Sequence, residues 1–403
     1  MQATATDRGK RALLRESGSA ARSRVSMIEL FFDLVFVFAV TQLSHTLLAH
    51  MDAGGVFRVG LMFLGMWWLW IFTTWCTNWI DPDHPRARVL LFVLMLAGLI
   101  LSSAIPEAFA ERGLVFGAAF AAMQVLRTAF MVHAFGWRSA RGRNFLRILV
   151  WMATSAACWI VGGLAQPESR LAWWIAAIAI EYAGPALYFR VPGMGRSSTA
   201  EWDIDPHHIA ERCALFVIIA LGESLLVTGA TFAGLQWRTP QVLALLSAFV
   251  GSVAMWWLYF DTGAERASQR FVHDEDPGRV ARLAYTYLHL LIVGGIIVSA
   301  VADELVLMHP DHASDAGIAA ILGGPALYLF GNALFKWVTN RRRLPPLSHL
   351  VGLLLVFGIA PFAFGHVLSA LALGATMTGL MVLVAGWETI ALRRPVAGRL
   401  QAS

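Results

Sequence analysis

The stretch ELFFDLVFVFAVTQLSH, residues 29–45, determines how the rest of the chain is interpreted. It is apolar enough to belong to a membrane-spanning helix, yet it carries Glu29 and Asp33. A spacing of four residues places both carboxylates on one face of a helix, one turn apart. An ionised carboxylate in hydrocarbon is costly unless a partner compensates for it. The segment therefore predicts a membrane helix whose acidic groups serve an ion, a proton or a buried salt bridge.

Similar apolar runs recur along the whole chain. Its 403 residues are 58% hydrophobic and 14% charged, whereas soluble domains average about 25% charged. Because an open sheet cannot satisfy its backbone in lipid, we interpret these runs as helices. Twelve helices are predicted, at 27–48, 57–80, 88–106, 114–135, 145–165, 171–190, 210–233, 241–262, 281–304, 316–338, 347–366 and 369–392. The predicted fold is an all-α, polytopic transmembrane helix bundle.

The two halves of the chain resemble each other. MWWLWIF at 66–72 is similar to MWWLYFD at 255–261, and SAIPEA at 103–108 is similar to SAVADE at 299–304. Each pair lies six predicted helices apart, which preserves orientation and predicts two parallel six-helix repeats. The predicted parts are a disordered basic cytoplasmic tail, a first six-helix half, a cytoplasmic linker, a second six-helix half and a cytoplasmic tail, at 1–26, 27–190, 191–209, 210–392 and 393–403.

The distribution of basic residues predicts the orientation. With a cytoplasmic N-terminus, the inside segments hold most of the 31 Lys and Arg residues. The outside loops hold Arg58, Arg112, Arg170 and Arg238. This is the asymmetry of the positive-inside rule, so both termini are predicted to be cytoplasmic. The net charge of +5 then reflects topology, and no nucleic-acid partner is predicted, since that would need one clustered basic face.

Four acidic positions fall inside predicted spans. At 1.5 Å per residue, Asp33 lies about 13 Å beyond the last arginine of the tail, and Glu181 and Glu223 lie near the middle of their helices. Glu29 precedes Asp33 on the same helix, and Arg127 is the one cation predicted at similar depth. One arginine cannot neutralise four carboxylates, so the others are expected to be protonated, to hold a cation or to face water. All four are candidate ion- or proton-binding residues.

Nearby charged residues are candidate partners for these carboxylates. Arg127 and Arg212 are expected to tune their ionisation, and Glu211 lies beside Arg212. A structural network is the alternative interpretation. In it, Arg127 would bridge a carboxylate of the first helix, while Arg212 would pair with Glu211 or Glu223.

Histidines add candidate proton relays. His289 lies about eight residues into the predicted ninth helix, where it can relay protons or pack against neighbouring helices. His208, a second candidate relay, stands with His207 three to four residues before Glu211, a spacing that could seat a metal. A helix start at Pro206 explains that pattern equally well. We predict no metal site and no cofactor.

Two segments resemble a known family. ELFFDLVFVFAVTQLSH (29–45) and HHIAERCALFVIIALGESLL (207–226) are similar to the low temperature requirement A (LtrA) family of bacterial membrane proteins. The matching positions are Glu29, Leu30, Phe31, Phe32, Asp33, Leu34, Val35, Phe36, His208, Glu211, Arg212, Gly222 and Glu223. Cys213 and Ala214 stand where the family more often has Phe-Gly. The resemblance implies a bacterial cytoplasmic-membrane protein with a role in growth at low temperature, and it implies no established biochemical activity.

Three functions remain open at this point. The first is a transporter or channel linked to a monovalent cation or proton, with Asp33 and Glu223 as the binding groups. The second is a non-transporting membrane factor that supports growth or complex stability in the cold. The third is an intramembrane lipid-modifying enzyme using His207, His208 and Glu211. The expected partners are the lipid bilayer, the ion or proton, and further copies of the chain in a homo-oligomer.

Overall fold

The structure, a computed structural model, describes residues 13–15, 25–197, 204–261, 280–340 and 344–393. This part of the chain contains twelve α-helices and no named strand, which confirms the all-α prediction. Eleven helices are long and apolar enough to cross a membrane, so the protein is a multi-pass membrane protein. Most of the predicted tails, and positions 198–203 of the predicted linker, lie outside the described residues.

The chain divides into two compact units, which are described separately. The first consists of Met1–Thr46 and Ala53–Arg212, and the second of Leu47–Asp52 and Cys213–Ser403. The boundary after Arg212 falls inside helix α7 (Pro206–Ala233). That helix begins four residues earlier than predicted, so His208 is helical rather than part of a linker. The first turns of α7 therefore belong to the first unit.

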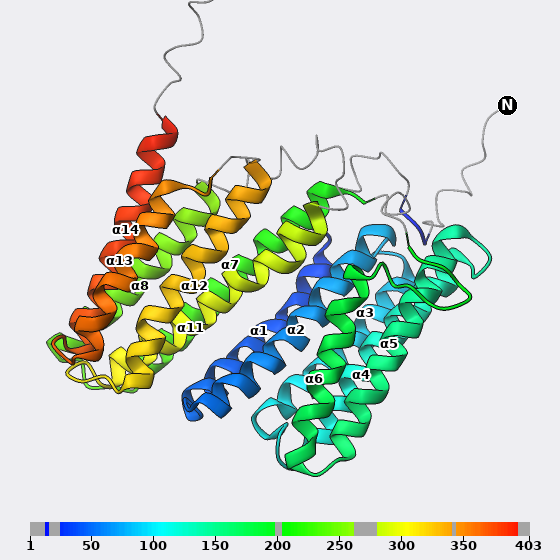
Figure 1. Ribbon diagram of the computed structural model, residues 1–403, viewed down its shortest axis with the longest axis horizontal. Helices are drawn as coiled ribbons and strands as arrows, with labels where there is room; N and C mark the ends of the chain where they lie inside the picture. The colour runs from blue at the N-terminus through cyan, green and yellow to red at the C-terminus, as the bar shows by residue number, and fades with distance from the viewer. Residues whose placement is uncertain (1–12, 16–24, 198–203, 262–279, 341–343, 394–403) are drawn as a thin grey trace, which may run out of the picture. The chain divides into compact units, whose positions relative to one another are not determined.

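Six further helices build the first unit (Figure 1). They are α1 (Met27–Ala49), α2 (Ala53–Trp79), α3 (Pro85–Ala104), α4 (Gly113–Phe135), α5 (Ala140–Leu164) and α6 (Pro167–Ala186). Helix α4 packs on α5 and α3, α5 packs on α6, and α2 contacts α4 and α6. Helix α6 is the one outside the set of eleven apolar spans, and it carries Glu168, Arg170 and Glu181.

Aromatic side chains fill the space between α4, α5 and α6. Phe120 stacks on Trp159 with ring centroids 4.2 Å apart, and Trp159 lies 5.3 Å from Trp174. All three rings are fully buried. Glycine makes this packing possible, because a Cβ at Gly117 would lie 2.3 Å from the Trp159 carbonyl oxygen. The α4–α5 contact is thus a backbone-to-backbone approach that only glycine permits.

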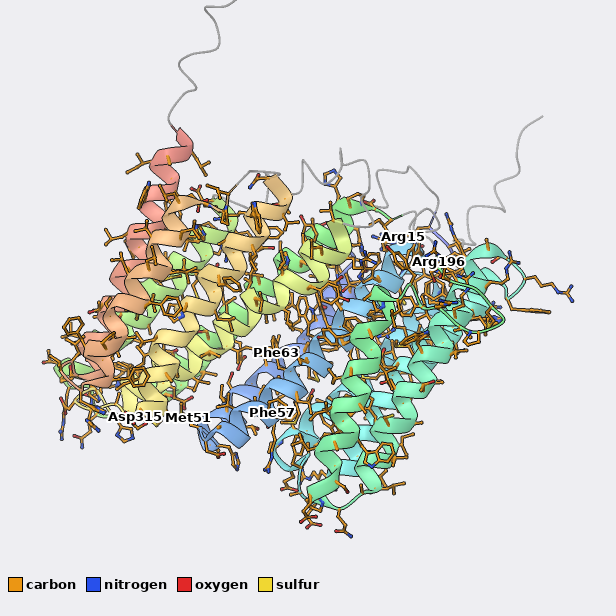
Figure 2. The ribbon with its side chains drawn as sticks, viewed as in Figure 1. Arg15, Met51, Phe57, Phe63, Arg196 and Asp315 are labelled. Carbon is orange, nitrogen blue, oxygen red and sulfur yellow. The ribbon has the colours of Figure 1, made fainter. Side chains whose placement is uncertain are left out.

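Residues 13–15 of the predicted N-terminal tail contact the end of α2. The Arg15 backbone N–H donates to the Trp79 carbonyl at 2.9 Å, and Arg15 Nε donates to the Ile80 carbonyl at 2.9 Å. The last carbonyls of a helix have no partner within the helix, and these bonds satisfy two groups at the end of α2. Arg15 and Arg196 lie at one end of the first unit and Phe57 lies at the other (Figure 2).

The second unit contains the rest of α7 and five further α-helices. They are α8 (Thr239–Tyr259), α11 (His289–Met308), α12 (Asp315–Asn340), α13 (Leu347–Phe364) and α14 (Ala370–Arg393), with a π-helical segment, η4 (Ala281–Leu288), leading into α11. Helix α11 packs on α12, and α14 packs on α8 (Figure 1). The predicted break between the last two helices is confirmed, with His366 at a φ of 53° in the turn.

We expect Gly117→Val to destabilise the first unit by about 1–3 kcal/mol, the usual cost of overpacking a filled core. The Trp159 carbonyl belongs to the backbone of α5, so it cannot move aside without separating the two helices. Gly60→Val is the matched control, since nothing lies within 4 Å of its Cβ position. Thermal unfolding in detergent measures both variants, and equal losses would contradict the close α4–α5 approach.

Candidate functional site

The first turn of α1 is held by a capping box between Ser26 and Glu29. The Ser26 backbone N–H and hydroxyl donate to Glu29 Oε2 at 2.9 and 3.0 Å, and the Glu29 N–H lies 3.4 Å from Ser26 Oγ. Arg15 Nη2 adds an ion pair to the same carboxylate oxygen at 3.4 Å. The Ser-x-x-Glu pattern is a common helix start. Glu29 therefore lies at the end of its helix and not in the middle of the span.

The other oxygen of Glu29 contacts His208 in the first turn of α7. Glu29 Oε1 lies 2.9 Å from His208 Nε2, and both side chains are fully buried. Asn78 fixes the tautomer of His208. Its Oδ1 accepts from the Asp205 backbone N–H at 2.8 Å, so its Nδ2 faces His208 Nδ1 at 3.3 Å as a donor. His208 Nδ1 is then the acceptor, and Nε2–H donates to Glu29.

Asp33 forms a buried ion pair with Arg212 one turn further along both helices. Arg212 Nη2 donates to Asp33 Oδ1 at 2.8 Å, and Trp70 Nε1 donates to the same oxygen at 2.7 Å. All three side chains are 0% exposed. The guanidinium also lies over the Trp70 ring, 5.7 Å from its centroid, and Arg212 Nη2 lies 3.4 Å from Thr74 Oγ1. Helices α1, α2 and α7 thus meet at one carboxylate.

This ion pair uses only part of its hydrogen-bonding capacity. Asp33 Oδ2, Arg212 Nε and Arg212 Nη1 are buried and have no hydrogen-bond partner in the part of the chain that the structure describes. A buried polar atom without a partner costs about 1–3 kcal/mol, and more when it is charged. A purely structural arginine–carboxylate pair commonly forms two parallel bonds. Asp33 therefore has one oxygen without a donor among the described residues.

Arg127 and Glu181 lie elsewhere in the first unit. Arg127 Nη1 donates to the Leu69 carbonyl at 3.0 Å and to Thr73 Oγ1 at 3.1 Å, and Arg127 Nη2 donates to Gln124. The alternative interpretation, in which Arg127 bridges a carboxylate of the first helix, does not hold, because its hydrogen-bond partners are neutral groups. Arg127 nevertheless lies within electrostatic range of Glu181.

Glu181 is held by neutral donors from α5. Ser155 Oγ donates to Glu181 Oε1 at 2.6 Å, and Trp159 Nε1 donates to the same oxygen at 3.2 Å. Glu181 is fully buried, and Pro185 follows it by four residues inside α6. Because proline has no N–H, the carbonyl of Glu181 lacks its usual helical donor.

The pairing of Arg212 also differs from the structural network considered from the sequence. Arg212 bonds Asp33 rather than Glu211 or Glu223. Glu211 is exposed, and its Oε2 accepts from the Val25 backbone N–H at 3.3 Å. Arg212 is fully buried, as Arg127 is, so the first unit has at least two deeply buried cations. The predicted charge balance of one arginine against four carboxylates is therefore wrong.

Two of the predicted site residues belong to the second unit. Glu223 is 6% exposed in the later part of α7. His289 is fully buried, and its Nδ1 donates to the Ala284 carbonyl at 2.9 Å while its Nε2 accepts from Tyr259 Oη at 2.7 Å. Both ring nitrogens of His289 are thus hydrogen-bonded, one as donor and one as acceptor, and the ring stacks on Tyr285.

The sequence interpretation missed several residues that position this network. The Ser26-x-x-Glu29 pattern was a readable capping signal, but Asn78 and Trp70 carry no motif and are identified only by their contacts.

In the second unit, Lys336 Nζ bonds Glu388 at 2.6 Å and the Leu258 carbonyl at 2.8 Å. Across the described ranges, no three or more His, Cys, Asp or Glu side chains form a cluster that could hold a metal ion.

A double-mutant cycle tests the buried pair. Arg212→Gln or Asp33→Asn alone should cost about 3–5 kcal/mol, because either leaves an uncompensated buried charge. The double variant removes both charges and should be much less destabilised than the sum of the two losses. Unfolding of the purified variants in detergent measures the coupling. Additive losses would contradict a direct pair.

The chain is similar to known proteins over most of its length. The family model described as bacterial low temperature requirement A protein (LtrA) matches residues 24–386. The chain is 42% identical over 380 residues to an uncharacterized protein, RA0937, of Rhizobium meliloti (strain 1021), covering 92% of this chain and 90% of that protein. No solved structure matches significantly. The match across most of the chain shows that it belongs to the bacterial low temperature requirement A (LtrA) family.

Proposed function

We propose that this protein moves protons or monovalent cations across the bacterial cytoplasmic membrane, with Asp33 as the exchanging carboxylate. The observation that carries the proposal is the half-satisfied ion pair between Asp33 and Arg212 inside apolar helices. Intramembrane carboxylates of this kind typically mark ion or proton pathways. Glu223 and Glu181 are proposed as further carboxylates of the pathway.

Asp33 suits this role better than Glu29. Both oxygens of Glu29 already accept bonds, from His208 on one side and from Ser26 and Arg15 on the other. Asp33 accepts both of its bonds through Oδ1 and keeps Oδ2 open. Glu29 therefore fixes the start of α1 and orients His208, while Asp33 exchanges its partner.

Arg212 gives the exchange an energetic link to the helices. A proton or cation on Asp33 weakens its attraction to the guanidinium, which then needs another acceptor because an unpaired buried charge is costly. Two nitrogens of Arg212, Nε and Nη1, have no acceptor among the described residues and can bond such a group. Occupancy of Asp33 thereby changes how strongly α1 holds the first turns of α7.

A specific observation favours the second function, a non-transporting membrane factor. Glu29 and Asp33 each contact a side chain of α7, and all four groups are fully buried. Such paired side chains hold helices together without any ion movement. The two functions differ in whether the purified protein produces flux.

We expect proteoliposomes containing the wild-type chain to show proton or rubidium flux above that of empty liposomes. Asp33→Asn should reduce this flux to the level of empty liposomes, because an amide cannot exchange a proton or balance a cation. A pH-sensitive dye inside the vesicles and rubidium uptake measure the two ions. Asp315→Asn is the matched control, since that carboxylate is 77% exposed at the start of α12.

The double variant Asp33→Asn/Arg212→Gln separates function from folding. It restores electrical neutrality without restoring a carboxylate, so it should fold and remain inactive. Wild-type flux in this variant would assign the pair a structural role only. Absence of flux from the wild-type protein would overturn the transport proposal and favour the membrane factor.

A further inference from the structure

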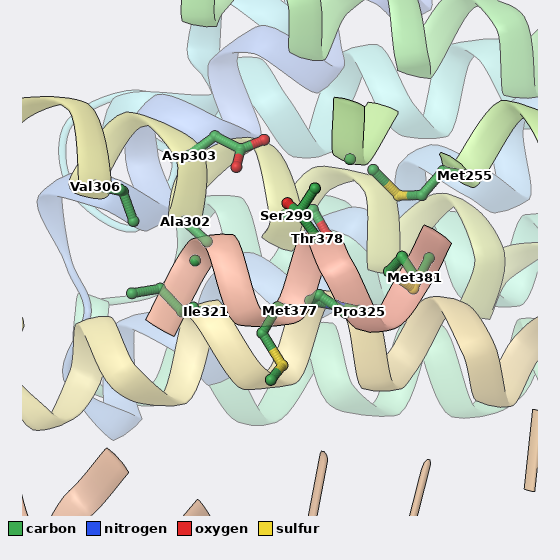
Figure 3. A pocket seen from close by; sticks show the side chains of 12 residues that line it. Met255, Ser299, Ala302, Asp303, Val306, Ile321, Pro325, Met377, Thr378 and Met381 are labelled. Atoms are coloured by element: carbon green, nitrogen blue, oxygen red, sulfur yellow. The ribbon is translucent and has the colours of Figure 1, made fainter. Parts of the chain in front are cut away.

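A pocket of about 40 Å³ lies inside the second unit, between α8, α11, α12 and α14 (Figure 3). It is larger than the space that one water molecule needs. Its walls are largely apolar and include Met255, Met377 and Met381. None of the carboxylates singled out from the sequence lines it. The acidic group that does line it is Asp303.

Asp303 and Ser299 are adjacent polar groups on one face of α11. They are four residues apart, so their side chains lie one helical turn from each other, and both border the pocket (Figure 3). Asp303 makes no hydrogen bond or ion pair with any residue in the described part of the chain. Ser299 is 5% exposed, and its Oγ also lacks a partner. Two polar side chains therefore border one pocket, and neither bonds a donor from the described part of the chain.

Helix α12 has a backbone carbonyl without its helical donor at a residue that lines the pocket. Ile321 and Pro325 both line it, and Pro325 has no N–H to donate to the Ile321 carbonyl. Proline inside a membrane helix frees a carbonyl in this way, and freed carbonyls commonly coordinate cations in transport proteins. Thr378 borders the pocket as well, but its hydroxyl already bonds Ser247 from α8 at 3.1 Å.

We propose that this pocket binds one alkali-metal cation through Asp303, Ser299 and the Ile321 carbonyl. The charge fits, since a single carboxylate balances one monovalent cation. Divalent cations such as calcium take six to eight oxygen ligands, usually several carboxylates among them. Hard oxygen ligands suit hard cations such as sodium or potassium.

This site is separate from the proposed exchange at Asp33. It lies within Cys213–Ser403, whereas Asp33 belongs to the first unit. Equilibrium binding therefore tests it whether or not the protein moves ions.

The test uses the full purified chain in detergent. Binding of radioactive sodium is measured at equilibrium, with potassium and lithium as competitors. Thermal unfolding is followed in sodium chloride against N-methylglucamine chloride. We expect saturable binding and a cation-dependent rise in the unfolding temperature. Asp303→Asn should lower the affinity about tenfold or more, because it removes the charged ligand, and Ser299→Ala should weaken binding several-fold.

Glu304→Gln is the matched control, since it alters the adjacent carboxylate of α11. Glu304 Oε1 accepts from Thr231 Oγ1 at 3.2 Å, and Glu304 is not among the residues lining the pocket. This variant should bind sodium as the wild type does, and so should Asp33→Asn/Arg212→Gln. The latter result distinguishes this site from the one in the first unit.

Three results would overturn the proposal. They are no saturable cation binding by the wild type, undiminished binding by Asp303→Asn, and equal losses in Asp303→Asn and Glu304→Gln. Size-exclusion profiles check that each variant is folded. If Asp303→Asn does not fold, Ser299→Ala decides the question, and wild-type affinity in that variant counts against the site.

Discussion

The first unit depends on one constraint, which is that charges buried among apolar helices must find partners there. Glu29 and Asp33 are spaced by four residues on α1, and His208 and Arg212 are spaced by four residues on α7. They form two contacts one helical turn apart, Glu29 Oε1 with His208 Nε2 at 2.9 Å and Asp33 Oδ1 with Arg212 Nη2 at 2.8 Å. Because an unpaired buried charge is strongly destabilising, these two contacts set both the rotation and the register of α1 against the start of α7.

The Glu29–His208 and Asp33–Arg212 contacts differ in how completely the carboxylate oxygens are hydrogen-bonded. Glu29 has donors on both oxygens and caps its helix, so it is a fixed part of the scaffold. Asp33 has one oxygen without a donor, and Asp303 of the second unit has no bonded partner among the described residues. Carboxylates with open oxygens are the ones that can gain from a proton or a cation. The proposed roles therefore assign ion or proton binding to Asp33 and Asp303 and a structural role to Glu29.

Similar sequence does not produce similar environments in the two units. Trp67 and Trp68 of MWWLWIF are 2% and 0% exposed, whereas Trp256 and Trp257 of MWWLYFD are 44% and 39% exposed. In SAIPEA, Pro106 follows the end of α3, and Glu107 forms an exposed ion pair with Arg112. In SAVADE the helix continues, and Asp303 borders a pocket. The parallel repeat stays a prediction.

The sequence by itself determined the helical fold, most helix boundaries and the break after α13, because lipid leaves a spanning backbone no alternative to internal hydrogen bonding. The face shared by Glu29 and Asp33 also followed from helical periodicity. Only the tertiary structure decided which cation meets which carboxylate. Asp33 and Arg212 are 179 residues apart, and hydropathy carries no information on how two helices rotate against each other. For the same reason the sequence could not identify Asp303 as a pocket residue, since the pocket forms only when four helices pack together.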